Sequence, residues 1–399
     1  MATRSIALLG STGSIGQSTL DIVRRFPERF TVDLLVAGVR VEQLAKDIVE
    51  FRPAHAIVAT QKALSDLQKQ LGLTAREFRW NETELAAGVD AVTSAIKESP
   101  AQVVVAAVVG MAGLPGVLAT AEAGKTIALA NKESLVVAGA LVMETARRCG
   151  ATIIPVDSEH SAIFQCLMGL PRERRHDVAS VILTSSGGPF RTKPLAEFAD
   201  ITLEQALKHP KWSMGAKITI DSSTMMNKAL EVIEAHWLFA MPPSQIEVVV
   251  HPEHIIHSFV RFVDGAILGQ LGLPDMRGPI SLAINYPDGR LSGAIPQLDL
   301  TTMGALHFEP VDAAKFPSVG RAYEVLAAGG GMPAVFNAAN EVAVEGFLGG
   351  GIPYMTIHKV VEAALEKFSG ASYTNLSEVS ALCAEVTAWS RQYAGIVPK

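Results

Sequence analysis

A glycine-rich turn between an apolar strand and a helical stretch constrains the fold of this chain more than any other feature. The sequence GSTGSIG at residues 10–16 follows the apolar run 5–9 and precedes a helical pattern that extends to about Phe26. Glycines at this spacing let the backbone turn sharply and approach a phosphate, and the following helix presents unpaired N–H groups to the phosphate charge. The pattern favours a dinucleotide-binding turn, and an ordinary tight turn is the alternative.

Apolar runs separated by helical patterns continue along the first part of the chain. They lie at residues 32–37, 56–59, 103–109, 126–130 and 153–156. Uninterrupted apolar strands that alternate with helices are typical of a parallel sheet with both faces covered. We therefore predict an α/β fold in which residues 1–157 form an N-terminal, Rossmann-like parallel-sheet domain that binds a dinucleotide cofactor.

The pattern becomes less regular after Asp157. Strand candidates lie at residues 178–184, 217–220, 246–250 and 266–270, turn residues are frequent over 286–301, and helical patterns dominate from about Val311. We predict a central α+β catalytic domain over residues 158–285, a linker over 286–311 and a C-terminal helical bundle over 312–399.

Composition restricts the partners and the compartment. The 399 residues include 34 Lys and Arg against 40 Asp and Glu, which gives a net charge of −6 and no overall basic field for nucleic acid or an anionic membrane. The cysteines, Cys149, Cys166 and Cys383, are odd in number and far apart, which favours a reducing compartment over a disulfide framework. The N-terminal apolar run is too short for a secretory signal, so we expect a cytoplasmic protein.

An uncharged stretch at residues 101–121 has the length of a membrane span. It contains three glycines and Pro115, which interrupt a spanning helix. A buried strand, a glycine loop and a helix start are the better interpretation, and we expect no membrane partner.

The end of the second strand indicates the type of nucleotide. The sequence there is Ala37-Gly38-Val39-Arg40, with an arginine and without a carboxylate. A carboxylate at this place usually binds the ribose hydroxyl of NAD, whereas an arginine suits the additional phosphate of NADP. NADPH is therefore the better cofactor, and a solvated surface arginine is the alternative.

Polar residues follow two later strands. Asn131-Lys132-Glu133-Ser134 comes after the run 126–130, and Asp157-Ser158-Glu159 after the run 153–156. Ligands bind outside the carboxyl ends of such strands. In an extended chain Asp157 and Glu159 point to the same side, where two carboxylates repel unless a cation neutralises them, and oxygen ligands suit Mg²⁺ or Mn²⁺. The alternative in both places is a helix start with capping residues.

The central part contains two candidate anion-binding segments. Asp221-Ser222-Ser223 comes before a helical pattern in which Asn227, Lys228 and Glu231 lie near one face, so Glu231 could complete the metal ligands while the others bind an anion. The alternatives are helix caps and a surface Lys–Glu pair. The second segment, Ser185-Ser186-Gly187-Gly188, can form an anion-binding turn with its backbone N–H groups or be a plain glycine turn.

Two histidine-containing stretches give weaker signals. His209-Pro210-Lys211-Trp212-Ser213-Met214-Gly215 has the composition of a loop that closes over a substrate, with a packed surface loop as the alternative. His251, His254 and His257 have the spacing of a metal cluster but lack acidic partners, and we interpret them as structural.

Taken together, these segments resemble the 1-deoxy-D-xylulose 5-phosphate reductoisomerase family. The resemblance rests on GSTGSIG, LANKESLV, PVDSEHSAIFQ, TSSGGPF, HPKWSMG and DSSTMMNKALEVIEA, and it continues through LGLPDMRGPI and FNAANE in the later part. Many relatives have Gly-x-Asn after the second strand, where this chain has Val39 and Arg40, so the contacts with the 2′-phosphate differ here.

The resemblance implies a site made of residues from most of the chain. It implies Asp157, Glu159 and Glu231 as metal ligands and, with Lys132 and His209, as the catalytic residues. It implies substrate contacts from Lys132, Ser158, Glu159, Ser186, His209, Ser222, Asn227, Lys228 and Glu231. It implies cofactor contacts from Thr12, Gly13, Ser14, Ile15, Gly38, Arg40, Asn131, Glu133 and Gly215.

The family consists of homodimeric enzymes that use NADPH and Mn²⁺ or Mg²⁺. The resemblance implies that 1-deoxy-D-xylulose 5-phosphate is rearranged and then reduced to 2-C-methyl-D-erythritol 4-phosphate, in the non-mevalonate route to isoprenoids. Two other hypotheses stay open at this point: an NADP-dependent semialdehyde or homoserine dehydrogenase, and a regulator that binds NADPH without turnover. A semialdehyde dehydrogenase of the acylating type needs an activated cysteine, and none of the three cysteines has neighbours that would activate it. A regulator that only binds NADPH does not need the acidic residues Asp157, Glu159 and Glu231.

Overall fold

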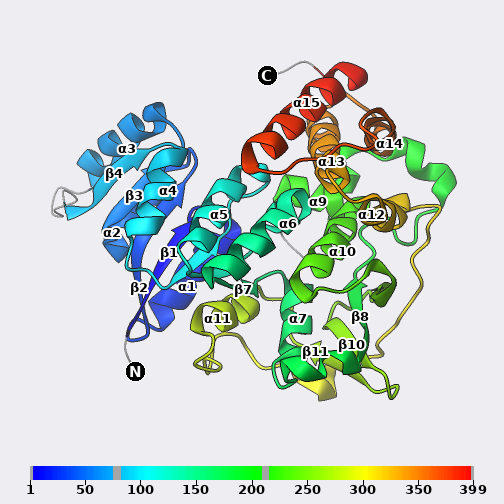
Figure 1. Cartoon of the computed structure of the whole chain (residues 1–399), viewed down its shortest axis with the longest axis horizontal. Helices are drawn as coiled ribbons and strands as arrows, with labels where there is room; N and C mark the ends of the chain where they lie inside the picture. The colour runs from blue at the N-terminus through cyan, green and yellow to red at the C-terminus, as the bar shows by residue number, and fades with distance from the viewer. Residues whose placement is uncertain (1–2, 75–81, 209–214, 397–399) are drawn as a thin grey trace. The chain divides into compact units, whose positions relative to one another are not determined.

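The computed structural model describes residues 3–74, 82–208 and 215–396 (Figure 1). The chain forms two compact units. Unit 1 consists of Met1–Ser134, Val142–Ser161 and Asp275–Pro296, and unit 2 of Leu135–Leu141, Ala162–Pro274 and Gln297–Lys399.

Unit 1 is built on a seven-stranded, all-parallel sheet. Its strands are β1 (Arg4–Leu9), β2 (Phe30–Ala37), β3 (His55–Val58), β4 (Glu84–Ala87), β5 (Val103–Ala106), β6 (Thr126–Leu129) and β7 (Thr152–Pro155). The strand order is β4-β3-β2-β1-β5-β6-β7. The order reverses at β1, between β2 and β5, and the ligand crevice of such sheets lies outside the carboxyl ends of the strands at this point.

Helices cover this sheet because its strands are apolar on both faces. They are α1 (Ser14–Arg25), α2 (Val41–Phe51), α3 (Gln61–Thr74), α4 (Val89–Glu98), α5 (Leu114–Glu122) and α11 (Arg277–Asn285), with the short η2 (Met111–Gly113) before α5. On one face Leu9, Val36 and Val104 form a hydrophobic core with residues of α4 and α5. Ile6, Leu8 and Leu35, which alternate with them along the strands, are also fully buried.

A late segment of the chain belongs to unit 1. Arg277 Nη1 of α11 lies 3.0 Å from Asp21 Oδ2 of α1, and Arg29 Nη2 donates to Asn285 Oδ1 at 2.9 Å. These contacts group residues 275–296 with the N-terminal sheet, so the compact units do not follow the order of the chain. The predicted ranges 1–157, 158–285, 286–311 and 312–399 stay a prediction.

Unit 2 contains a mixed sheet of four strands. These are β8 (Val178–Ser185), β9 (Ile246–Val250), β10 (Ile256–Phe262) and β11 (Ile267–Leu271), in the order β11-β10-β8-β9. β10 is antiparallel to β8 and β11, and β9 is parallel to β8. The sheet therefore has β11 at one edge.

Helices form the rest of unit 2. They are α8 (Leu203–Ala206), α9 (Ala216–Ser223), α10 (Met226–Phe239), α12 (Pro317–Ala328), α13 (Met332–Leu348), α14 (Thr356–Lys367) and α15 (Leu376–Ala394), with short turns η3 (Arg172–Asp177), η4 (Leu195–Asp200), η5 (Pro243–Gln245) and η6 (Leu300–Thr302). α13 is almost completely buried, because α9, α12, α14 and α15 all pack against it. Two helices, α6 (Lys132–Cys149) and α7 (Ser158–Leu167), contribute residues to both units.

The predicted fold class is confirmed: a parallel α/β sheet, an α+β part with a mixed sheet, and a helical C-terminal part. Residues 101–121 form a strand, a glycine turn and a helix start as expected, and no helix among the described residues is long and apolar enough to cross a membrane.

Several local predictions were wrong. Residues 217–220 form part of α9 and not a strand, although the alternation of Lys217-Ile218-Thr219-Ile220 is strand-like. Burial against α13 and a Lys217–Asp221 ion pair one helical turn apart outweigh that preference. Strands β4 and β10 were not predicted, since the first is short and the second is interrupted by polar residues.

Candidate functional site

The glycine-rich turn of unit 1 has no room for side chains. A Cβ atom on Gly10 would lie 2.5 Å from Ala107 O, and one on Gly16 would lie 2.3 Å from Ser11 O. α1 begins at Ser14, and Gly13 before it offers no side chain to cap the helix. The first-turn N–H groups are thus left to bind an anion, as a pyrophosphate site requires.

Two glutamines and a buried acid hold this turn in place. Gln17 Nε2 donates to Ser11 O at 3.0 Å and to Asp47 Oδ2 at 2.9 Å, and Gln43 Nε2 donates to Asp47 Oδ1 at 2.9 Å. Burial raises the pKa of Asp47, and these two hydrogen bonds partly offset the rise. Gln17 thereby links the turn to α2.

The segment after β2 is open to solvent. Gly38, Val39 and Arg40 are all exposed, and Arg40 directly precedes α2. Within the described residues Arg40 makes no ion pair, so its guanidinium remains available for a phosphate.

The residues after β6 are buried and connected. Asn131 Nδ2 donates to Gly110 O at 2.9 Å and to Glu133 Oε2 at 3.2 Å, and its Oδ1 accepts from Ser134 Oγ. Asn131 is at the N-cap position of α6, but its side chain makes no capping bond. The alternative of a helix start with Glu133 in its first turn is therefore confirmed, although the Asn131 side chain does not cap the helix and instead links the turn after β5 to the start of α6.

Asp157 and Glu159 lie at the junction of β7 and α7. Lys132 Nζ pairs with Asp157 Oδ2, and Ser158 Oγ donates to Glu159 Oε2. Lys132 and Glu159 are buried. The expectation of an extended chain here was wrong, since α7 begins at Ser158 and Ser161 N donates to Asp157 O at 2.8 Å. The helix start places Asp157 beside Lys132 within unit 1.

α10 of unit 2 carries the three residues that were expected to share a helical face. Asn227 Nδ2 donates to Glu231 Oε1, and Lys228 Nζ pairs with Glu231 Oε2. Lys228 is 3% and Glu231 0% exposed, so the alternative of a surface Lys–Glu pair was wrong. Burying a charged pair costs more than an exposed one, which favours a functional reason for its presence.

The serine-glycine turn after β8 approaches the end of α9. Gly187 and Gly188 both have positive φ, at 79° and 67°, and a Cβ on Gly188 would lie 2.5 Å from Ser222 O. Gly187 N donates to Ser185 Oγ at 3.2 Å and Gly188 N donates to Ser186 Oγ at 3.4 Å, so the two serine hydroxyls hold this turn. This turn and Ser222 are thus adjacent within unit 2.

A sharp junction joins α9 to α10. Met225 has a φ of 54°, and its buried side chain lies in the core with Tyr354 and Phe190. Asp221, Ser222 and Ser223 are the last residues of α9 and not caps of the next helix, which corrects the expectation. The junction brings Ser222 near the start of α10, which carries Asn227 and Lys228.

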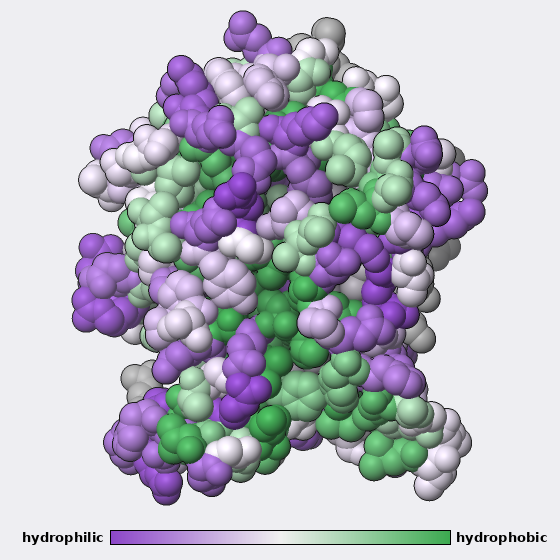
Figure 2. All heavy atoms as spheres, turned by 90° about the vertical axis from the view of Figure 1, so that its right-hand side faces the viewer, coloured by the Kyte–Doolittle hydropathy of each residue, from purple (hydrophilic) through white to green (hydrophobic). Residues whose placement is uncertain are grey.

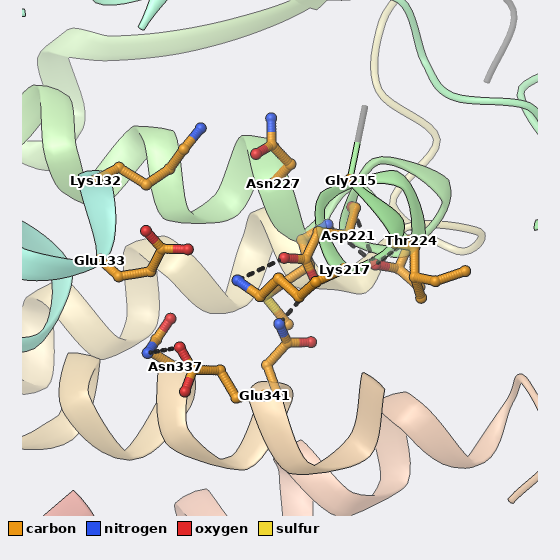
Figure 3. Close-up of polar contacts among 12 residues, drawn as sticks. Lys132, Glu133, Gly215, Lys217, Asp221, Thr224, Asn227, Asn337 and Glu341 are labelled. Atoms are coloured by element: carbon orange, nitrogen blue, oxygen red, sulfur yellow. Dashed lines mark hydrogen bonds and ion pairs between the residues drawn. The ribbon is translucent and has the colours of Figure 1, made fainter. Parts of the chain in front are cut away.

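Sequence reasoning missed a buried ion pair in α9. Lys217 Nζ lies 2.8 Å from Asp221 Oδ2 (Figure 3). Asn340 Nδ2 of α13 donates to Asp221 Oδ1 at 2.8 Å. The i, i+4 spacing of Lys217 and Asp221 was the available signal, but it has meaning only in a helix.

His209 lies outside the described residues, as do residues 210–214 of the expected closing loop. Gly215, the last residue of that loop, is exposed and precedes α9.

The histidines at 251, 254 and 257 are buried. His251 Nδ1 lies 2.9 Å from His307 O, and His251 Nε2 accepts from Ile255 N and Ile256 N at 3.3 Å. Both nitrogens of His251 are therefore used to hold the backbone, as a structural role requires.

The expected lack of an acid near these histidines was wrong, since Glu253 Oε2 lies 3.1 Å from His251 Nδ1. Burial raises the pKa of Glu253, but hydrogen bonds from the side chain and backbone of His307 outweigh it and lower the pKa to about 2.

Solved structures with the same fold cover nearly the whole chain. The 1-deoxy-D-xylulose 5-phosphate reductoisomerase from Zymomonas mobilis in complex with NADPH is 42% identical, with a TM-score of 0.89 and 99% of each chain covered. A DOX-P reductoisomerase in complex with NADPH, fosmidomycin and magnesium is 38% identical, with a TM-score of 0.92 and 98% of each chain covered.

Curated relatives and family models agree with these structures. The 1-deoxy-D-xylulose 5-phosphate reductoisomerase of Cupriavidus metallidurans is 50% identical over 94% of both chains, and that of Chlorobium phaeobacteroides is 49% identical over 99% of this chain and 100% of its own. Models of the 1-deoxy-D-xylulose 5-phosphate reductoisomerase family match residues 6–139, and models of its C-terminal domains match residues 153–239 and 271–393. The chain therefore belongs to the 1-deoxy-D-xylulose 5-phosphate reductoisomerase family.

Proposed function

We propose that unit 1 binds NADPH, that unit 2 binds the phosphate of the substrate, and that Asp157, Glu159 and Glu231 are ligands of one divalent cation. The reaction that the chain catalyses follows from the family to which it belongs. The chain is an NADP-dependent oxidoreductase that rearranges 1-deoxy-D-xylulose 5-phosphate and reduces it to 2-C-methyl-D-erythritol 4-phosphate in non-mevalonate isoprenoid biosynthesis.

The glycine-rich turn supports NADPH binding. Backbone packing at Gly10 and Gly16 leaves no space for a Cβ, and the uncapped start of α1 offers N–H groups to a pyrophosphate. Thr12, Gly13, Ser14 and Ile15 form this contact surface, and Asn131, Glu133 and Gly215 are proposed to hold the nicotinamide half. When bound, NADPH supplies the hydride that reduces the aldehyde.

Arg40 and Gly38 are proposed to recognise the 2′-phosphate. Arg40 is exposed, carries the charge that a phosphate needs, and follows the strand that ends beside the ribose in this fold. A Cβ on Gly38 would meet no atom within 4 Å, so the protein itself does not require glycine there. This leaves close approach of the nucleotide as the reason for glycine.

The donor set fits a hard divalent cation. Asp157, Glu159 and Glu231 offer only carboxylate oxygens, which suit Mg²⁺ or Mn²⁺ and not a thiolate-preferring metal. Glu159 and Glu231 are buried, and Glu231 is paired with Lys228. When bound, the cation polarises the substrate ketone and stabilises negative charge on its oxygen atoms. A homologous structure contains magnesium.

The phosphate of the substrate is proposed to bind in unit 2. Ser186, Ser222, Asn227 and Lys228 lie on the turn after β8, the end of α9 and the start of α10. Among the described residues the hydroxyl of Ser222 makes no hydrogen bond and is free to donate to a phosphate oxygen. His209 is proposed as a further contact. Binding at this remote end orients the reacting carbons.

Lys132 is proposed as the residue that manages charge during the rearrangement. Its ammonium group pairs with Asp157 in a buried position, which keeps a positive charge beside the proposed metal ligands. Ser158 and Glu159 are proposed to contact the hydroxyls of the substrate. The rearrangement breaks one carbon–carbon bond and forms another, and the aldehyde that results is then reduced.

The edge strand β11 supports a homodimer. Ile267 and Leu268 are each 50% and Leu271 is 40% exposed, and Figure 2 shows hydrophobic side chains gathered in the lower part of one face. An exposed apolar edge strand can pair with another chain. We propose that a second copy covers β11.

Free cysteines at 149, 166 and 383 agree with a cytoplasmic location, which is also proposed.

The buried Lys228–Glu231 pair next to Asn227 is the observation that carries the residue assignment. The test is a titration of the purified protein with Mn²⁺ followed by electron paramagnetic resonance. One ion per chain in the wild type and none in Glu231→Gln is the expected result. Unchanged binding by that variant would exclude Glu231 as a ligand.

A further inference from the structure

The segment that carries Ser222 is held on both sides by the C-terminal helices. Asn340 Nδ2 of α13 donates to the preceding residue, Asp221, at 2.8 Å. Tyr354 Oη, before α14, donates to the carbonyl of the following residue, Ser223, at 2.8 Å. Ser222 thus lies between two residues that the distant part of the chain fixes.

We propose that Asn340 and Tyr354 are positioning residues for the phosphate of the substrate. The inference rests on the proposed role of Ser222, and it assigns to the C-terminal helices a part in substrate affinity. Neither side chain contacts the phosphate. Each holds a neighbour of Ser222, and through it the direction of the Ser222 hydroxyl.

The hydrogen bond between Asn340 and Asp221 is buried, so its loss is expected to disturb the end of α9. Asp221 is 1% and Asn340 0% exposed, and Lys217 pairs with the second oxygen of Asp221, as Figure 3 shows. A buried carboxylate needs a partner for each oxygen. Removal of the Asn340 amide leaves Asp221 Oδ1 short of a donor, and the end of α9 must move to compensate.

Tyr354 connects both proposed halves of the phosphate pocket. Its ring packs edge-on against Phe190 with 5.4 Å between ring centres, and Phe190 ends the turn that starts at Ser186. Burial raises the pKa of Tyr354, so its hydroxyl stays protonated and available as a donor. The same side chain therefore supports the turn after β8 through its ring and the end of α9 through its hydroxyl.

The two halves also touch directly. A Cβ on Gly188 would lie 2.5 Å from Ser222 O, so the turn and the end of α9 are in close backbone contact. A small displacement of one is transmitted to the other because there is no space between them. The hydroxyl of Ser222 makes no hydrogen bond to any described residue, so only its backbone neighbours determine where it points.

The central test is Tyr354→Phe, which removes one hydroxyl and keeps the ring. Its matched control is Tyr323→Phe, because Tyr323 Oη donates to the backbone carbonyl of Ile246 at 2.9 Å in the same unit. Tyr354→Phe removes the hydrogen bonds of Tyr354 Oη with Ser223 O and with Ser223 Oγ. We expect it to raise KM for 1-deoxy-D-xylulose 5-phosphate and the Ki of inorganic phosphate by roughly 3- to 10-fold. KM for NADPH is expected to stay unchanged, and kcat to change by less than about 2-fold.

A double-mutant cycle with Ser222→Ala separates positioning from general stability. If Tyr354 acts through Ser222, Tyr354→Phe has little further effect on KM once the Ser222 hydroxyl is absent. Asn340→Ala is expected to behave in the same way, and its thermal unfolding shows whether it folds. Equal KM values for Tyr354→Phe and wild type, or an undiminished effect in the Ser222→Ala background, would overturn the inference.

Failure of the proposed function gives a different result. If Ser222→Ala alone leaves KM and the Ki of inorganic phosphate unchanged, Ser222 does not bind the phosphate and the positioning role falls with it. If Ser222→Ala raises both values but Tyr354→Phe raises neither, the phosphate pocket stands and only the positioning role is wrong.

Discussion

Lys228 and Glu231 form an ion pair one helical turn apart on α10, and both side chains are almost completely buried. An isolated buried pair contributes little to stability because desolvation offsets the attraction. The buried pair is consistent with the proposal that Glu231 binds a divalent cation and Lys228 a phosphate.

Replacement of Glu231 tests this assignment. Glu231→Gln is expected to lower kcat by at least about 100-fold, since even the supporting partners of metal ligands contribute roughly 10- to 100-fold. NADPH affinity, measured by fluorescence titration, is expected to stay near the wild-type value. Glu345→Gln, which removes an ion pair with Arg391 of 2.6 Å, is the control, and near-normal turnover by Glu231→Gln contradicts the assignment.

Arg40 is expected to distinguish the two nicotinamide cofactors. Arg40→Ala removes a charge-assisted contact and should weaken NADPH binding by roughly 10- to 100-fold. NADH lacks the 2′-phosphate, so its affinity should change by less than about 3-fold. Lys46→Ala also removes one positive charge from an exposed position on α2 and serves as the control. Equal losses for both cofactors would rule out recognition of the 2′-phosphate by Arg40.

The proposed phosphate pocket is tested by removal of two hydroxyls. Ser186→Ala combined with Ser222→Ala should raise KM for the substrate by roughly 10- to 100-fold, because each hydroxyl would bond a charged group. Ser180→Ala removes a hydrogen bond of 2.6 Å from Ser180 on β8 to Glu247 on β9, and it should leave KM unchanged. Steady-state kinetics give both values, and an unaltered KM in the double variant dismisses the pocket.

The sequence predicted the parallel sheet because its apolar runs and the glycines at residues 10–16 are local signals. The roles of the polar residues after each strand stay predictions, and α7 begins at Ser158 where an extended chain was expected. Local signals could not predict the surroundings of Asp221, because its carboxylate accepts a hydrogen bond from Asn340, which is 119 residues away along the chain. The strand predicted at 217–220 failed for the same reason, since packing against α13 decides it.

Stability is expected to fall in mild acid because of His358. Burial lowers the pKa of His358 to about 4, below its ordinary value of 6.5. Between these values the unfolded chain binds a proton that the folded chain does not, so the free energy of unfolding decreases as pH falls from 6.5 towards 4. The loss between pH 7 and pH 5 should be at most about 2 kcal/mol.

Urea unfolding at both pH values measures this loss. His358→Gln has no titrating group at this position and should show a smaller difference between the two pH values than the wild type. His176→Gln removes an exposed histidine and serves as the control. An identical pH dependence for His358→Gln and wild type would show that other groups are responsible.

A charged residue on the edge strand should disrupt the proposed homodimer. Leu268→Arg places a charge on the half-exposed β11, where a second copy would have to bury it. Analytical ultracentrifugation is expected to give a dimer for the wild type and a monomer for the variant. A wild type that sediments as a monomer at micromolar concentration would contradict the dimer, and a variant that still dimerises would place the contact elsewhere.

The most direct test of the account is the initial rate of NADPH oxidation by the purified protein with 1-deoxy-D-xylulose 5-phosphate. The protein is first treated with a chelator and then supplied with Mg²⁺ or Mn²⁺. Turnover that requires both the sugar phosphate and the cation, and that forms 2-C-methyl-D-erythritol 4-phosphate, is the predicted result. Full turnover without a cation, or none when NADPH, substrate and cation are all present, would contradict it.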